Sequence, residues 1–369
     1  LHKAIRRQRQ MCIRDRYLQP YGVRIALLTG GMRAKARREL LLNLELGLVD
    51  VVVGTHALLE EDVRFANLSL TVTDEQHRFG VEQRARLSNK SENAPDVLVM
   101  TATPIPRTLA LTVYGDLDIS VMKGRPPQRK PVRTLCYTDE RRREVYAGLV
   151  RQVQAGRQAY VVCPLIEESD VLAVHSAERV YEELKRDFLQ DIPCALLHGR
   201  LKGAEKDAIM SNFAAGELKV LVSTTVIEVG VNVPNATLMV IENAERFGLA
   251  QLHQLRGRVG RGSEQSYCVL LTAADSPEAL ARLNVLHESE DGFYLAEKDM
   301  EQRGAGQLFG LKQHGLPDLR IADIMRDVDV IAQVRQLAQA QLRTPEDWAE
   351  IRRLVEMQFG ERFNMIFNT

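Results

Sequence analysis

Two acidic residues that directly follow a β-branched run are the first feature that could carry chemistry. Leu70–Thr73 continues into Asp74-Glu75-Gln76-His77. An aspartate after a buried parallel strand lies at the carboxyl edge of its sheet, where doubly wound folds bind ligands. There Asp74 can hold Mg²⁺, and Glu75 can orient or deprotonate a water molecule. A strand that ends in an ordinary polar turn would look the same, so the pair alone leaves both interpretations open.

An arginine-rich segment offers the complementary chemistry. Gln254-Leu-Arg-Gly-Arg-Val-Gly-Arg261 packs three arginines into six positions, with two glycines that allow close approach of the backbone. Arginine stabilises the charge on a transferring phosphoryl group. We expect Arg258 and Arg261 to lie about one helical turn apart on one face. The alternative is a solvated basic turn of the kind common in nucleic-acid binders.

Two further loops combine hydroxyl groups with stiff or small residues. Thr101-Ala-Thr-Pro-Ile-Pro-Arg107 places Thr101 and Thr103 before two prolines, and Thr224-Thr-Val-Ile-Glu-Val-Gly-Val-Asn-Val-Pro234 includes Gly230. Each alone fits a plain turn between a strand and a helix. Because these segments all lie at expected strand ends, two in each half of the chain, we expect one composite site between two lobes.

The elements that must position these residues form an α/β pattern. Near-continuous apolar strands that alternate with helices predict parallel sheets covered on both faces. The expected strands are Val23–Leu28, Asp50–Val53, Leu70–Thr73, Val97–Thr101, Val132–Tyr137, Ala159–Cys163, Cys194–Leu197, Val220–Ser223, Leu238–Ile241 and Tyr267–Leu271. The expected helices are Lys35–Leu46, Arg141–Gln154, Ser176–Phe188, Ala204–Ala214, Pro277–Ser289, Ile321–Leu342 and Pro345–Phe359.

The strand-and-helix pattern occurs twice and is then followed by helices alone. A polar, Pro- and Gly-rich stretch at 123–131 separates the two occurrences and is a plausible hinge. The stretch 292–318 is Gly- and Gln-rich with charges. We therefore expect a basic tail at 1–16, an incomplete first lobe at 17–130, a second lobe at 131–274 and a helical appendix at 275–369.

The composition is that of an ordinary soluble protein. The 369 residues are 45% hydrophobic and 27% charged, which argues against a disordered or fibrous chain. Lys+Arg and Asp+Glu are both 49, so any basic surface must be local. No apolar run approaches the ~18 residues needed to span a bilayer. Five scattered cysteines without a CxxC pair argue against a zinc site or a disulfide framework and fit a reducing cytoplasm.

The four segments in this order resemble the motor of superfamily-two helicases, with two RecA-like lobes. The resemblance is closest to the RecG family of ATP-dependent branched-DNA helicases. It extends from about Tyr17 to Leu342 and includes Arg246-Phe-Gly-Leu-Ala-Gln-Leu-His-Gln-Leu-Arg-Gly-Arg-Val-Gly-Arg261. The transcription-repair coupling factor shares much of these segments. The appendix separates the two families, because Gly292–Gly315 resembles the translocation hairpin and loop of the RecG family.

The resemblance implies a role for each candidate residue. ATP and Mg²⁺ would be the cofactors, with Mg²⁺ on Asp74, the attacking water on Glu75 and coupling to DNA through His77. Arg258 and Arg261 would reach the γ-phosphate. Gln254 and Gly230 would assist nucleotide binding. Contacts to nucleic acid and coupling would involve Thr101, Thr103 and Thr224, and, in the translocation loop, Arg303 and Gln313.

One family motif has no counterpart, because the sequence contains no G-x-x-x-x-G-K-[ST] loop for the β- and γ-phosphates. We therefore expect the C-terminal motor portion of such a helicase, without the DNA-wedge domain and the phosphate loop. The partner would be branched double-stranded DNA, such as forks and Holliday junctions, bound by a monomer. The alternative is a non-catalytic DNA- or partner-binding module. A less favoured alternative is the transcription-repair coupling translocase.

Overall fold

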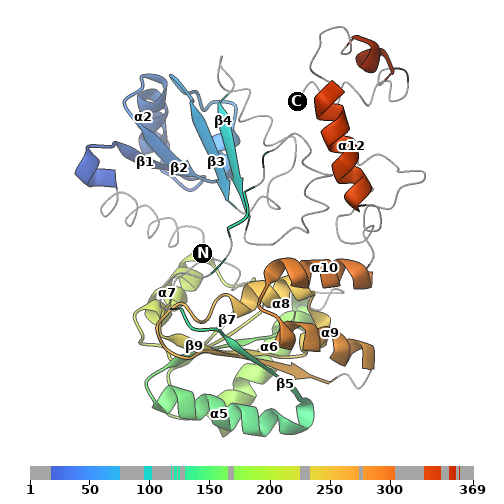
Figure 1. The fold of residues 1–369 in the computed structure, drawn as a ribbon. Coiled ribbons are helices and arrows are strands. Elements are labelled where there is room, and N and C mark those ends of the chain that lie inside the picture. The colour runs from blue at the N-terminus through green and yellow to red at the C-terminus, as the bar shows by residue number, and fades with distance from the viewer. Residues whose placement is uncertain are drawn as a thin grey trace. The chain divides into compact units, whose positions relative to one another are not determined.

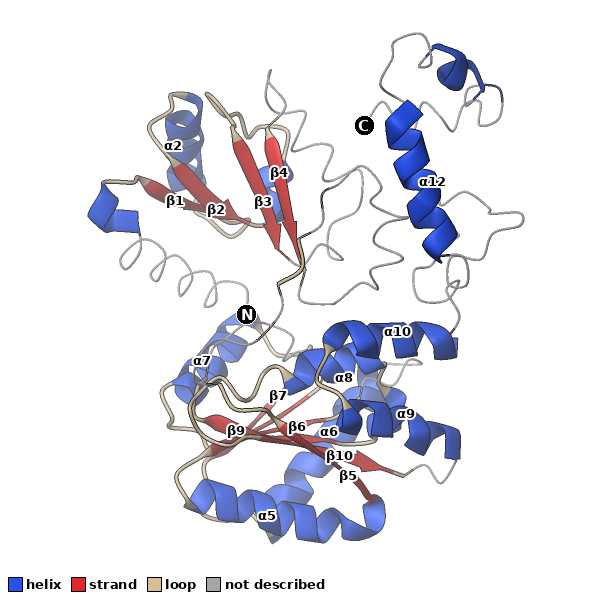
Figure 2. Cartoon of the chain, in the orientation of Figure 1, coloured by secondary structure: helices blue, strands red, loops and turns tan. Residues whose placement is uncertain are grey.

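The structure, a computed structural model, describes most of the chain outside several loops and the termini. The described residues are 18–74, 95–101, 129–164, 170–224, 233–273, 277–303, 328–341 and 349–354, with single positions at 118, 120–122, 124 and 357. In this part of the chain the strands form three sheets, and all strand pairs are parallel. Helices cover the largest sheet on both faces (Figures 1 and 2). The fold class is therefore α/β, as the sequence predicts.

The largest sheet has six strands in the order β5-β10-β9-β6-β8-β7. Its strands are β5 (Arg133–Thr138), β6 (Gln158–Val162), β7 (Cys194–Leu197), β8 (Val220–Ser223), β9 (Ala236–Ile241) and β10 (Tyr267–Thr272). Strands β6, β8 and β9 are buried along their whole length. Such runs are typical of a parallel sheet that is covered on both faces.

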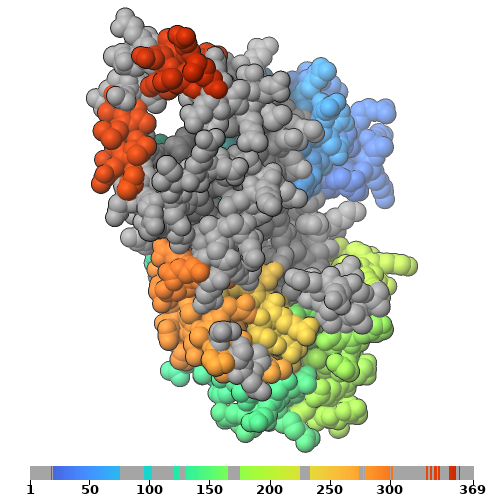
Figure 3. Space-filling view, turned by 90° about the vertical axis from the view of Figure 1, so that its right-hand side faces the viewer, coloured from blue at the N-terminus to red at the C-terminus, as the bar shows by residue number. Residues whose placement is uncertain are grey.

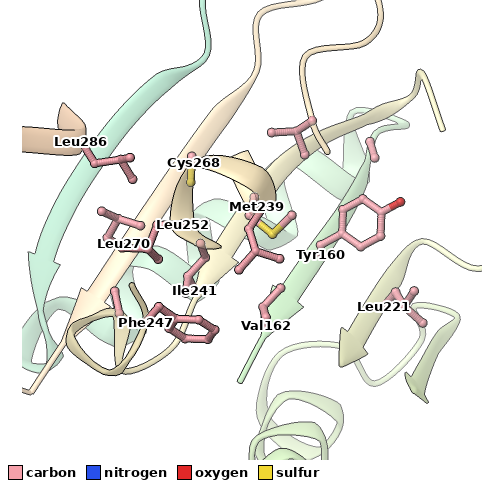
Figure 4. Packing of buried hydrophobic residues seen from close by; sticks show 14 of the residues in the cluster. Tyr160, Val162, Leu221, Met239, Ile241, Phe247, Leu252, Cys268, Leu270 and Leu286 are labelled. Atoms are coloured by element: carbon pink, nitrogen blue, oxygen red, sulfur yellow. The ribbon is translucent and has the colours of Figure 1, made fainter. Parts of the chain in front are cut away.

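Two apolar layers cover the faces of this sheet. One contains side chains of α5 (Arg142–Gln154) and α6 (Asp170–Asp187). The other contains side chains of α7 (Gly203–Ala214), α8 (Leu249–Arg256) and α9 (Pro277–Glu288), which Figure 4 shows in part. Successive strand residues alternate between the layers: Tyr160 and Val162 belong to the second and Val161 to the first. In the space-filling view the green, yellow and orange elements lie close together (Figure 3).

Two smaller sheets precede the large one in the sequence. Strand β1 (Ile25–Leu28) pairs with β2 (Val51–Gly54), and α2 (Ala34–Glu45) connects them. Strand β3 (Leu70–Asp74) pairs with β4 (Asp96–Met100). The chain divides into two compact units, Leu1–Ala66 with Lys123–Leu295 and Asn67–Met122 with Ala296–Thr369. The boundaries expected at 16, 130 and 274 stay predictions.

The remaining described elements are helical. They are α10 (Gly292–Arg303), α12 (Val328–Gln341) and the short 3₁₀ helices η2 (Gln19–Tyr21), η3 (His56–Leu59), η5 (Asp139–Arg141) and η7 (Ala244–Arg246). No helix among the described residues has the length and hydropathy needed to cross a membrane. Cys163, Cys194 and Cys268 lie in or beside apolar runs, which predicts that they are buried; Cys163 and Cys268 are fully buried, whereas Cys194 is partly exposed.

All ten expected strands are present, with ends that shift by no more than two residues. Two helices were not among the ranges expected from the residue pattern, although α10 falls in the segment that resembles the translocation hairpin. Helix α8 is only eight residues long, and α10 begins with Gly292 in a stretch whose composition suggests a loop. Tertiary packing explains both, because Leu252 and Leu255 of α8 and Leu295 of α10 are buried in the second apolar layer. Most of the expected helix Pro345–Phe359 lies outside the described residues.

Candidate functional site

The first candidate carboxylate ends a strand, as the sequence predicts. Asp74 is the last residue of β3 and is partly buried, and its register partner is Met100 at the end of β4. Thr101 follows β4 directly, so Asp74 and Thr101 lie at the same carboxyl edge of this small sheet. A carboxylate at that edge can hold Mg²⁺. Glu75, His77 and Thr103 lie outside the described residues.

The arginine segment adopts a different geometry from the one expected. Helix α8 ends at Arg256 with Gly257 as its C-cap, so Arg258 and Arg261 lie in the following turn and not one helical turn apart. Gly260 has a φ of 74°, which breaks the helical path. The Nε of Arg261 donates a hydrogen bond to the Gly257 carbonyl oxygen at 3.2 Å. Gln254 lies within α8 and is partly buried.

The turn nevertheless places two guanidinium groups near each other. Burial, followed by the charge of Arg258, lowers the pKa of Arg261 below its ordinary value. Both side chains are partly buried near Tyr160, whose own pKa burial raises to about 12. Two cations that are partly desolvated and repel each other bind an anion favourably, because the anion relieves both costs. The pair therefore fits a phosphate group.

Close packing of two glycines fixes where the turn lies. A Cβ on Gly260 would lie 2.6 Å from Val132 Cγ2, just before β5, and one on Gly262 would lie 2.7 Å from the Pro234 carbonyl oxygen, just before β9. The turn therefore lies toward the amino ends of these strands. Our expectation that all four segments follow strand ends does not hold for the arginine segment.

The third arginine of the segment has a separate role that sequence reasoning missed. Arg256 is 3% exposed. Its Nη1 donates hydrogen bonds to the carbonyl oxygens of Leu286 at 2.7 Å and Ser289 at 2.9 Å, and to Thr134 Oγ1 at 3.3 Å. These bonds tie the end of α8 to the end of α9. Its spacing is the sequence signal that could have separated it from the other two arginines, because Arg256 lies four positions after Leu252, on the buried face of α8.

Thr224 lies at the carboxyl edge of the large sheet. It follows β8 directly, is fully buried, and its backbone N–H donates to the Leu197 carbonyl oxygen at 3.2 Å. Its Oγ1 has no hydrogen-bond partner among the described residues. Gly230 and Gln313 lie outside the described residues, and Arg303 is the last residue of α10.

A buried acidic residue at another strand end was not predicted. Glu242 follows β9 and is 4% exposed. Tyr146 Oη donates to Glu242 Oε1 at 2.6 Å, and Arg142 Nε lies 3.2 Å from Oε2. Burial raises the pKa of Glu242, whereas Arg142 opposes that shift. Because both oxygens are already engaged, this carboxylate ties α5 to β9 and is not available to a ligand.

Three stretches of the chain match models of known helicase families. Residues 4–112 match the DEAD/DEAH box helicase model, and residues 141–263 match the helicase conserved C-terminal domain. Residues 289–358 match the model "ATP-dependent DNA helicase RecG, domain 3, C-terminal".

Curated relatives named ATP-dependent DNA helicase RecG match most of the chain. The protein of Bacillus subtilis is 49% identical over 332 residues, which cover 90% of this chain and 48% of that protein. The protein of Escherichia coli O157:H7 is 50% identical over 327 residues, covering 87% and 47%. The chain thus spans about half the length of these relatives.

Solved structures of helicases also match this chain. A structure of RecG bound to a three-way DNA junction has a TM-score of 0.66 and 43% identity, and the match covers 89% of this chain and 42% of that one. A structure of the Mycobacterium smegmatis helicase Lhr, at 18% identity and a TM-score of 0.57, shows the shared fold alone.

The parallel α/β fold and the two helicase models define the chain as a superfamily-two helicase with RecA-like domains. Within that class, the RecG-specific model and the relatives at 49–50% identity all indicate one family. The chain belongs to the RecG family.

Proposed function

We propose that the protein is an ATP-dependent DNA translocase of the RecG type that acts on branched DNA in recombination and repair. The observation that carries the proposal is the pair of partly buried arginines, Arg258 and Arg261. They lie on a turn in which Gly260 and Gly262 have no room for a side chain. Arginines in that setting stabilise the charge of a transferring phosphoryl group. The relative bound to a three-way DNA junction supports the choice of substrate.

The proposed chemistry divides between two sides of a nucleotide. Asp74 would hold Mg²⁺, Glu75 would activate the attacking water, and His77 would relay the nucleotide state. Arg258 and Arg261 would contact the γ-phosphate, with Gln254 and Gly230 assisting nucleotide binding. The position of Asp74 at a carboxyl edge fits a magnesium ligand, since hard cations prefer carboxylate oxygens. ATP bound with Mg²⁺ would supply the phosphoryl group for hydrolysis.

Hydrogen bonds connect the end of α8, next to the arginine turn, with α9 at the start of the appendix. Arg256 bonds to carbonyl oxygens at the end of α9, and the backbone continues almost directly into α10, which ends at Arg303. Arg282 of α9 also donates to the carbonyl oxygen of Glu245, before α8. A displacement of the arginine turn would therefore move α9 with it. Arg303 and Gln313 would pass this movement to DNA, and Thr101, Thr103 and Thr224 would contact the nucleic acid.

Hydrolysis of ATP with and without forked DNA tests the proposal. We expect turnover that forked DNA stimulates in the complete enzyme, because this sequence contains no loop for the β- and γ-phosphates. The non-catalytic binding module predicts DNA binding without hydrolysis. Absence of DNA-stimulated hydrolysis would favour that alternative for the chain as it stands, and an Arg261→Ala variant separates true turnover from a contaminating ATPase.

A further inference from the structure

The segment that leads into β5 is held by the loop that follows the arginine turn (residues 257–262). Gln265 Nε2 donates to the Pro131 carbonyl oxygen at 2.8 Å. The Arg133 N–H donates to the Ser266 carbonyl oxygen at 2.9 Å, and from Arg133 onward β5 pairs with β10. The backbone that enters β5 therefore has a fixed position beside this loop.

The arginine turn itself packs on the same segment. A Cβ on Gly260 would lie 2.6 Å from Val132 Cγ2, so the backbone of the turn lies directly against Val132. An ion pair at 3.0 Å between Arg157 and Glu264 also ties the loop after the turn to the residue before β6. Arg129 is three residues before Val132 and is exposed. These contacts hold the segment that carries Arg129 next to the arginine turn.

The charge of Arg129 acts on the arginine turn. Burial lowers the pKa of Arg261 most, the charge of Arg258 lowers it further, and the charge of Arg129 adds a smaller lowering. Charges in a protein influence each other measurably only at short range, because water and salt screen them. Arg129, Arg258 and Arg261 therefore form one cluster of cations, which draws on two separate segments of the chain.

No described carboxylate neutralises two members of this cluster. Neither Arg129 nor Arg261 forms an ion pair with another described residue, and the Nε of Arg261 donates to a backbone carbonyl oxygen. The charged groups that shift the pKa of Arg261 include no carboxylate. Cations that repel one another are stabilised by an anion that lies among them. The cluster is therefore suited to an anion from outside the chain.

The arrangement of the cluster favours an anion with more than one charged group. Arg258 and Arg261 lie on one turn, where they suit a single phosphate, whereas Arg129 reaches the cluster from the segment before β5. A triphosphate carries its charges along a chain, so neighbouring phosphates can meet different cations. A guanidinium group presents a fork of N–H donors that matches two phosphate oxygens.

We propose that Arg129 is a further nucleotide-binding residue that contacts the triphosphate chain of ATP beside Arg258 and Arg261. Gln265 is then a positioning residue, which holds the Arg129 segment through the Pro131 carbonyl oxygen. This inference rests on the proposed function and adds a contact from a second segment. Because Arg129 attracts the phosphates in the bound substrate as well as in the transition state, it lowers KM and changes kcat little.

Steady-state ATP hydrolysis by the complete enzyme with forked DNA tests the inference. We expect Arg129→Ala to raise the KM for ATP about tenfold and to change kcat less than about twofold, because one charge-assisted hydrogen bond to the substrate is lost. Arg129→Lys keeps the charge and restores part of the KM. Lys130→Ala is the matched control and keeps the KM, since it removes an equal charge from the exposed neighbouring residue.

Inorganic tripolyphosphate, used as a competitive inhibitor, separates phosphate binding from an effect on folding. We expect Arg129→Ala to raise the inhibition constant of tripolyphosphate by the same factor as the KM. Gln265→Ala alone raises the KM about threefold, because one neutral hydrogen bond is lost. In the Arg129→Ala background it has no further effect, since Gln265 acts through Arg129. Additive effects in the double variant would remove Gln265 from the positioning role.

The outcomes separate this inference from the proposed function. If Arg261→Ala abolishes hydrolysis but Arg129→Ala behaves like Lys130→Ala, Arg129 does not contact the nucleotide, and the proposed function stands. If Arg129→Ala keeps the KM and weakens DNA binding, Arg129 contacts DNA, and the inference is overturned. A raised KM with unchanged inhibition by tripolyphosphate also overturns it. If the unmodified complete enzyme hydrolyses no ATP, both the inference and the proposed function fall.

Discussion

Three arginines within one short segment occupy different environments. Arg256 is buried and its Nη1 donates to two carbonyl oxygens and a threonine hydroxyl, whereas Arg258 and Arg261 are partly buried near each other. Backbone carbonyl dipoles stabilise the charge of Arg256 inside the protein. Residue type alone therefore does not identify the arginines that meet a phosphate.

Strand-end carboxylates show the same ambiguity. Asp74 and Glu242 both follow an apolar strand, and the sequence pattern does not distinguish them. Glu242 is held by Tyr146 and Arg142, residues about one hundred positions away in the chain. Only the long-range contact shows that Glu242 has a structural role.

At the level of single residues, we predict that Glu75→Gln in the complete enzyme abolishes ATP hydrolysis and preserves nucleotide binding. Glutamine keeps the size and the hydrogen-bonding capacity of the side chain but cannot accept a proton from water. Steady-state hydrolysis with forked DNA and equilibrium binding of a fluorescent nucleotide measure the two properties. Normal turnover in this variant would remove Glu75 from the role of base.

His253 provides a second prediction at this scale. Burial, and to a smaller extent Arg256, lowers the pKa of His253 to about 4 from an ordinary value of 6.5. Between these values the unfolded chain binds the proton more readily, so the free energy of unfolding falls as the pH drops from 6.5 toward 4. Protonation of His253 lowers the free energy of unfolding by at most about 3 kcal/mol.

Urea denaturation at pH 7 and pH 4.5 measures this dependence. We expect His253→Gln to lose less stability on acidification than the unmodified protein, because glutamine does not titrate. His287→Gln, on the exposed side of α9, is the control for removing an imidazole. Equal acid sensitivity in the His253 variant and the unmodified protein would contradict the assignment.

At the level of elements, the turn after α8 depends on glycines for two distinct reasons. Gly260 has a φ of 74°, and a Cβ at this position would lie only 2.6 Å from the Cγ2 methyl carbon of Val132. Gly156, between α5 and β6, has a φ of 84° and open space around it. The two positions therefore separate backbone strain from steric crowding.

We predict that Gly260→Ala destabilises the protein more than Gly156→Ala does. The left-handed backbone costs an alanine about 1–2 kcal/mol at both positions. Crowding against Val132 adds roughly 1–3 kcal/mol at Gly260 alone. Thermal unfolding gives the stability of each variant, and ATP hydrolysis shows whether the arginine turn has moved. Equal destabilisation by the two substitutions would mean that the turn tolerates the extra methyl group.

At the level of the whole molecule, the proposed function requires two activities to be coupled: ATP hydrolysis and movement of branched DNA. We predict that Arg303→Ala leaves DNA-dependent hydrolysis largely intact and cripples branch movement, because Arg303 ends α10, beyond α9, and is not one of the residues proposed to bind the nucleotide. Parallel assays of hydrolysis and of junction unwinding on one preparation measure both. Unchanged branch migration would show that the translocation-loop assignment is wrong.

The sequence by itself determined the strands, the α/β class and the family, since these follow from local apolar runs and from contiguous motifs. It did not reveal α8, the turn that carries Arg258 and Arg261, or the separate role of Arg256. Those depend on contacts between residues distant in the chain, such as Gly260 with Val132 and Arg256 with Ser289. A short helix or a buried charge is stable only once its packing partners are present, so tertiary structure decided these features.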